Sequence, residues 1–153
     1  EIVEKYTKYR DNAHIPPQSV HLEITETATT LNIDLTLLIE KFHAHGFEVF
    51  LDDFGVGYSS LSTLNTLPFD RVKLDKSLID YIKTDKGLFM VDKIIEFSRK
   101  YRIQITAEGV EDAEQAAILK SMLHEDDALP RVDDIQGYYY ARPMPKEDFE
   151  KLL

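Results

Sequence analysis

Five polar residues recur along the sequence, each within or at the end of a short apolar run. They are Glu23, Asp52, Lys73, Glu108 and Gln136. Carboxylates that meet at one point can bind a hard divalent cation such as Mg²⁺ or Mn²⁺, because these ions prefer oxygen ligands. A lysine among them either contacts an anionic substrate or forms a buried ion pair with the acids. The residue types therefore favour a metal-assisted reaction, provided that the fold brings them together.

The elements that would carry these residues alternate between strands and helices. Runs rich in β-branched and aromatic residues predict five strands, at residues 21–25, 48–52, 71–75, 103–108 and 135–140. Helical patterns lie between them, at residues 34–45, 59–67, 86–101 and 112–123, and a last helix begins near residue 145. This alternation is typical of a parallel α/β fold.

The alternation of side chains along each strand predicts that the five polar residues share one face. Leu22 and Ile24 have the same parity, whereas Glu23 points to the opposite face, and the other four runs repeat this arrangement. The apolar face would pack on helices. Most of the polar residues fall toward the carboxyl ends of their strands, where parallel α/β folds build their sites. We therefore expect one shared site.

Length and composition limit the fold class and the kind of ligand. The 153 residues suit one domain but not a complete (β/α)₈ barrel, which takes about 250 residues. The five strands could form an open doubly wound sheet or part of a barrel. A net charge of −10 opposes binding to a DNA or RNA duplex.

The sequence contains no cysteine, which excludes disulfides and thiolate zinc sites. It shows neither a membrane-spanning segment nor a signal peptide. We expect a cytoplasmic domain without membrane contact of its own, either free or as the cytoplasmic part of a membrane-anchored protein.

The most specific motif is Leu51-Asp-Asp-Phe-Gly-Val-Gly-Tyr-Ser-Ser-Leu61. Taken alone, its adjacent acids Asp52 and Asp53 could belong to a solvated turn. The whole string closely resembles the pattern Asp-Asp-Phe-Gly-Thr-Gly-Tyr-Ser-Ser-Leu of EAL domains, the bacterial cyclic di-GMP phosphodiesterases. Val56 stands in place of the threonine of that pattern. The residues that would shape the loop after the acids are Phe54, Gly55, Gly57 and Tyr58.

Four further motifs extend this resemblance along the chain in the same order. They are Leu22-Glu-Ile-Thr-Glu-Thr27, Leu67-Pro-Phe-Asp-Arg-Val-Lys-Leu-Asp-Lys-Ser77, Ala107-Glu-Gly-Val-Glu111 and Gln136-Gly-Tyr followed by Pro143. The resemblance implies a TIM-like (β/α) barrel of the EAL type. Residues 1–153 would then form the C-terminal portion of a single EAL domain, with about its last five strands and their helices.

The resemblance also implies a role for each matching residue. Glu23, Asp52 and Glu108 match metal ligands, and Asp53 matches the neighbouring acid that serves the same pair of ions. Lys73 matches the lysine that contacts the attacking water or the phosphate, so the catalytic set would be Lys73, Glu108 and Asp52. Three more residues match supporting positions: Gln136 an amide that lines the site, Glu26 the acid that holds the loop, and Glu111 an acid near the metal and ligand.

The function implied for the complete domain is hydrolysis of cyclic di-GMP to pGpG with two Mg²⁺ or Mn²⁺ ions, within a bacterial signalling protein. The family's Glu-Ala-Leu motif and an asparagine on the next strand do not occur, and their positions would precede Glu1. We therefore expect this fragment to be inactive alone. Two alternatives stay open: a non-catalytic EAL module that binds cyclic di-GMP or a protein partner, and an enolase-like barrel in which Lys73 is a proton-abstracting base.

Three smaller expectations concern the surface. A partial barrel leaves exposed strand edges, which predicts self-association into homo-oligomers. Residues 123–134 are longer and more acidic than the family's usual connector, which predicts a solvated loop. The tyrosines at residues 138–140 are interpreted as packing residues of the fifth strand, with stacking on guanine as the alternative.

Overall fold

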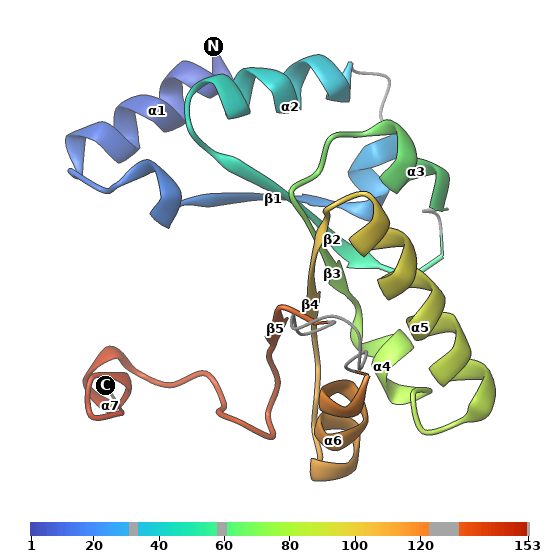
Figure 1. Cartoon of the computed structure of the whole chain (residues 1–153). Coiled ribbons are helices and arrows are strands. Elements are labelled where there is room, and N and C mark those ends of the chain that lie inside the picture. The colour runs from blue at the N-terminus through green and yellow to red at the C-terminus, as the bar shows by residue number, and fades with distance from the viewer. Residues whose placement is uncertain (31–33, 58–60, 123–131, 153) are drawn as a thin grey trace.

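Five parallel strands form one sheet in the computed structural model, which describes residues 1–30, 34–57, 61–122 and 132–152 (Figure 1). The strands are β1 (His21–Thr25), β2 (Glu48–Phe54), β3 (Arg71–Leu74), β4 (Gln104–Ala107) and β5 (Asp134–Ile135). Their order in the sheet is the same as their order in the chain. A doubly wound sheet would reverse its strand order at a switch point, whereas a barrel does not. The sheet therefore has the topology of a partial barrel.

Seven α-helices are found in the described residues. They are α1 (Ile2–Asn12), α2 (Leu35–Ala44), α3 (Leu61–Thr66), α4 (Lys76–Asp80), α5 (Asp85–Lys100), α6 (Ala113–Ser121) and α7 (Lys146–Phe149), with two short 3₁₀ helices, η1 (Pro17–Ser19) and η2 (Glu26–Thr30). Figure 1 shows α3, α4 and α5 on one side of the sheet and α7 apart from it. Asp112 and Gln115 form a capping box at the start of α6, as their spacing predicts.

The hydrophobic core lies between the sheet and these helices. The apolar faces of β2, β3 and β4 are fully buried, since Val49, Leu51, Val72, Leu74, Ile105 and Ala107 all have 0% exposure, while Leu22, Ile24 and Ile135 on β1 and β5 are partly buried. They belong to one cluster with helix residues such as Ile39, Val91 and Leu119. The predicted alternation is therefore present. The opposite face of the sheet carries the polar side chains, and its strands present them all in one direction.

The fifth strand differs most from its prediction. It ends at Ile135, so the interpretation of residues 136–140 as strand is wrong. Gly137 lies against the next segment so closely that a Cβ atom there would be 2.1 Å from the carbonyl oxygen of Val110. The chain then turns, and the amide of Tyr140 donates to the carbonyl of Gly137. The three tyrosines at 138–140 are exposed, which also contradicts their interpretation as packing residues.

Helix α4 was not predicted, because five residues are too few to show helical periodicity. The side chain of Asp75 caps it by accepting a hydrogen bond from the amide of Ser77. Two predictions fall largely outside the described residues, namely the placement of Tyr58 and the solvated loop at residues 123–134, of which 123–131 are not described. No helix in the described ranges is both long and apolar enough to span a membrane.

Candidate metal centre

A β-bulge in β2 places two acids where a regular strand would place one. Leu51 pairs with Val72, but Phe54 pairs with Leu74, so Asp52 and Asp53 together stand opposite Lys73. Asp53 has a positive φ of 57°, a conformation that costs energy in a residue with a side chain. Consecutive side chains of a regular strand point to opposite faces. Because of the bulge, Asp52 and Asp53 need not point to opposite faces at the end of β2.

The bulged acids meet a third carboxylate, which comes from the end of β4. Oxygen atoms of Asp52, Asp53 and Glu108 all lie within 4.8 Å of one another. Glu108 directly follows β4, which pairs with β3, so it reaches the same end of the sheet. These three acids are a set of oxygen donors gathered from two strands that are not neighbours in the sheet.

Lys73 lies among these acids on the strand between them. Its Nζ is 2.8 Å from Glu23 Oε1, 2.9 Å from Asp52 Oδ1 and 2.9 Å from Glu108 Oε1. Partial burial lowers the pKa of Lys73, but the contacts with Asp52, Glu23 and Glu108 outweigh it and raise the pKa above its ordinary value. Lys73 is therefore an ammonium at neutral pH. This charge state argues against the enolase-like alternative, which needs a neutral lysine to abstract a proton.

The acids have more negative charge than Lys73 can balance. Burial raises the pKa of Glu108, although its contact with Lys73 acts in the opposite direction. Burial and the neighbouring charge of Asp52 raise the pKa of Asp53. Asp52 Oδ1 is inaccessible to solvent and lies 2.9 Å from Lys73 Nζ, so a positive charge already faces it. A buried carboxylate oxygen of this kind, in a set made only of oxygen donors, fits a hard divalent cation.

Gln136 joins this group, whereas Glu111 lies beside it. The Gln136 side-chain amide donates to Glu108 Oε1. Glu111 Oε2 is 3.4 Å from Lys76 Nζ, and the Glu111 amide donates to the side chain of Gln115 over 2.8 Å. The structure thus brings Glu23, Asp52, Asp53, Lys73, Glu108 and Gln136 together and places Glu111 at the edge of the site.

An open cavity of about 640 Å³ begins next to Gln136 and Glu111. Its lining includes Tyr138, for which stacking on guanine was the alternative interpretation, and Lys76 and Arg142, which were not proposed as site residues from the sequence. The Arg142 guanidinium lies 4.8 Å from the centre of the Tyr138 ring. Two cations and an aromatic ring at its wall suit an anionic, aromatic ligand. In the sequence, this wall of the cavity corresponds to the motif Gln136-Gly-Tyr and the Arg142-Pro143 that follows it.

Glu26 holds the loop that follows the bulge. Its side chain is buried, at 3% exposure, and Oε2 accepts hydrogen bonds from the amides of Gly55 and Val56 over 3.1 Å and 3.2 Å. Gly55 has a φ of 111°, and a Cβ atom there would lie 2.5 Å from Leu78 Cδ1. Any other residue would be strained at this φ and would have to displace the Leu78 side chain, so glycine suits the position. Phe54, directly before it, is 4% exposed and belongs to the core.

Replacing Glu26 by alanine should destabilise this loop and weaken divalent-cation binding at the acids beside it. The Gly55 amide loses its acceptor, which costs about 1–3 kcal/mol of stability where the donor stays unpaired, and the Val56 amide keeps only its longer bond to the Asp53 carbonyl, at 3.4 Å. Thermal unfolding and Mn²⁺ titration calorimetry on the full-length protein measure both effects. Glu26→Gln is the matched control, since it keeps an acceptor oxygen and should lose less. Equal losses in the two variants would show that the charge, not the acceptor, matters.

Comparisons with known proteins show which family the chain is similar to. A family model described as EAL domain matches residues 1–143. The probable cyclic di-GMP phosphodiesterase PdeD of Escherichia coli (strain K12) is 38% identical over 153 residues, which cover 99% of this chain and 27% of PdeD.

Two solved structures share the fold. The EAL domain of Mycobacterium smegmatis DcpA matches with a TM-score of 0.86 and 31% identity, over 99% of this chain and 65% of that one. The PaMucR phosphodiesterase in complex with c-di-GMP matches with a TM-score of 0.82 and 29% identity, over 96% of this chain and 57% of that one. The chain spans less than two thirds of the length of each of these three proteins.

The resemblance seen in the five sequence motifs is thereby confirmed, and so is the expected class of fold. The match of the family model over most of the chain shows that the chain belongs to the EAL domain family.

Proposed function

We propose that this chain supplies the metal centre of a cyclic di-GMP phosphodiesterase, which hydrolyses the cyclic dinucleotide to linear pGpG in the bacterial cytoplasm. The observation that carries the proposal is the meeting of Asp52, Asp53 and Glu108 within 4.8 Å, beside the ammonium of Lys73. The names of similar proteins support the substrate: PdeD is named a probable cyclic di-GMP phosphodiesterase, and PaMucR was solved with c-di-GMP.

The three carboxylates, with Glu23, would hold Mg²⁺ or Mn²⁺. Such ions, when bound, lower the pKa of a water molecule and compensate the charge of a phosphate. The side chains of this chain then have separate tasks. Lys73 provides a fixed positive charge at the place where phosphate oxygens gain negative charge. Gln136 orients Glu108 through its hydrogen bond, and Glu26 keeps the loop after Asp53 in place.

The cavity beside Gln136 would take part of the nucleotide. Tyr138 offers a ring on which a guanine can stack, and Lys76 and Arg142 offer positive charge to a phosphate. For Tyr138 we therefore retain the alternative interpretation, in which the exposed ring contacts the ligand.

We further propose that β1 to β5 are the later strands of a barrel whose earlier strands carry the family's Glu-Ala-Leu glutamate and its asparagine. β1 pairs with β2 alone in the described part of the chain, so its other edge is free to receive an earlier strand. On this view, the fragment by itself holds an incomplete ligand set. Self-association of the fragment through its sheet edges stays a prediction.

The experiment is a chromatographic assay for pGpG with the full-length protein. Cyclic di-GMP is incubated with Mg²⁺, with Mn²⁺ and with a chelator, beside the fragment of residues 1–153. We expect product from the full-length protein with either ion, none with chelator, and recovery when excess metal is restored. The fragment should give none.

Product in the presence of chelator would overturn the metal-dependent mechanism. Absence of product under every condition would favour the non-catalytic module, and calorimetric affinity for cyclic di-GMP would then separate a nucleotide receptor from a protein scaffold.

A further inference from the structure

A second ring of side chains lies directly beneath the metal centre, on the same face of the sheet. Each member lies on a strand and stands two positions before a site residue in the chain, which corresponds to about 7 Å along an extended segment. The members are His21, Phe50, Arg71, Thr106 and Asp134, below Glu23, Asp52, Lys73, Glu108 and Gln136 respectively. Arg71 is the centre of this lower ring.

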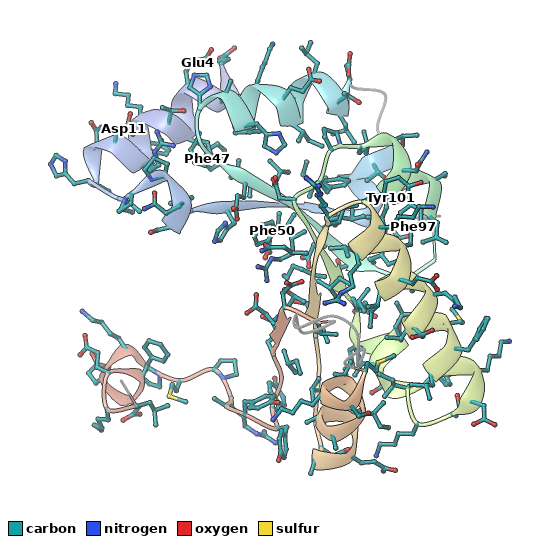
Figure 2. The ribbon with its side chains drawn as sticks, in the orientation of Figure 1. Glu4, Asp11, Phe47, Phe50, Phe97 and Tyr101 are labelled. Carbon is teal, nitrogen blue, oxygen red and sulfur yellow. The ribbon has the colours of Figure 1, made fainter. Side chains whose placement is uncertain are left out.

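The Arg71 guanidinium contacts three strands besides its own. One terminal nitrogen donates to Thr106 Oγ1 over 2.9 Å and also pairs with the Asp134 carboxylate, while the other donates to Gln104 Oε1 over 2.8 Å. The guanidinium carbon lies 5.1 Å from the centre of the Phe50 ring on β2. Only 14% of the Arg71 side chain is exposed. Figure 2 shows Phe50 beside the strands of the sheet.

These contacts add to those of β5, the shortest of the five strands, where the amides of Asp133 and Gln136 donate to the carbonyls of Ile105 and Ala107. β5 contains two residues and pairs with β4 at two positions. Asp134 is one of these two residues, and Gln136 follows it by two. The ion pair with Arg71 therefore adds a side-chain contact to the strand that Gln136 follows, beside its main-chain hydrogen bonds. The bond to Thr106 does the same for the strand that precedes Glu108.

We propose that Arg71 is a positioning residue of the metal centre. It links β4 and β5 to β3 and to the ring of Phe50 on β2, and this linkage sets Glu108 and Gln136 at the height of Lys73 and Asp52. The planar guanidinium is required because it presents several N–H groups in fixed directions while its face rests on an aromatic ring. The proposal rests on the proposed function only in that the acids bind a divalent cation.

The test uses the full-length protein and two arginines in similar surroundings. Arg10 is also buried, at 8% exposure, its guanidinium lies 4.6 Å from the Phe47 ring, and it donates to the carbonyl of His45. Figure 2 shows Phe47 near α1 and α2, away from Phe50. Arg10→Met is therefore a matched control for Arg71→Met. Mn²⁺ affinity by titration calorimetry and the thermal midpoint in chelator are measured for both.

We expect Arg71→Met to weaken Mn²⁺ binding by about 10- to 100-fold, the range found when a group that orients a metal ligand is lost. Arg10→Met should change Mn²⁺ affinity less than about twofold, even where the two midpoints fall equally. Arg71→Lys keeps the positive charge beside Asp134 but loses the planar set of N–H groups, and should recover only part of the Mn²⁺ affinity. If Arg71→Met does not fold, Asp134→Asn decides, because it keeps the shape of the side chain and should still weaken Mn²⁺ binding severalfold.

Equal Mn²⁺ affinities in Arg71→Met and Arg10→Met, or in Asp134→Asn and the unmodified protein, would overturn the positioning role while leaving the proposed function intact. Failure of the unmodified protein to bind Mn²⁺ would overturn both.

Discussion

Asp52→Asn in the full-length protein is expected to lower the rate of cyclic di-GMP hydrolysis by a factor of about 10³ or more. The asparagine keeps the size of the side chain but removes the negative charge from a position that is 19% exposed and central to the acidic group. A neutral amide oxygen is a much weaker partner for a divalent cation than a carboxylate. Mn²⁺ affinity should therefore fall together with the rate.

Chromatographic assay of pGpG and Mn²⁺ calorimetry measure the two effects of Asp52→Asn. Asp148→Asn is the matched control, because Asp148 is an exposed acid of α7 that pairs with Lys151. It should change neither quantity. An Asp52→Asn protein that retains the rate but binds Mn²⁺ weakly would mean that the acidic group is a metal site unrelated to hydrolysis.

Lys73→Met is expected to bind Mn²⁺ more tightly and yet to hydrolyse cyclic di-GMP about 10²-fold more slowly or worse. The ammonium of Lys73 contacts Glu23, Asp52 and Glu108, so its charge opposes any cation that binds to the same oxygens. Removing it also leaves these acids without their counter-charge. The variant should therefore unfold at a lower temperature in chelator and regain stability as Mn²⁺ is added.

The control for Lys73 is Lys83→Met. Lys83 also pairs with two acids, Asp112 and Glu114, but at the start of α6. It should leave both the Mn²⁺ affinity and kcat unchanged. Weaker Mn²⁺ binding in Lys73→Met would contradict the competition described here and would give Lys73 a role in holding the acids together.

Much of the site could be predicted from parity and motifs. Leu22 and Ile24 on one face and Glu23 on the other suffice to place Glu23 inward, and the same holds for Lys73. The strand order could not be predicted in this way, because five strands of this length fit either an open sheet or a barrel. The sequence motifs, and then the observed pairing of the strands, distinguish the barrel from the open sheet.

The bulge at Asp52 and Asp53 shows where parity fails. Strict alternation would have sent these two carboxylates to opposite faces, and although aspartate adopts a positive φ more readily than most residues with a side chain, this preference does not single out Asp53 among the acids of the chain. The role of Arg71 was missed for a different reason. It has the parity of Lys73, two positions on, but its partners come from β4 and β5, far along the chain, and only the folded sheet brings them together.

The order of the strands also has a consequence for folding during synthesis. Each strand pairs with the one made just before it, so the sheet can grow from its N-terminal side without waiting for distant segments. Lys73 on β3 would reach Glu23 and Asp52 soon after they are made and neutralise part of their charge. Glu108 would follow, and Gln136 would arrive last. A ribosome-bound chain should therefore acquire a stable sheet well before it acquires a finished metal centre.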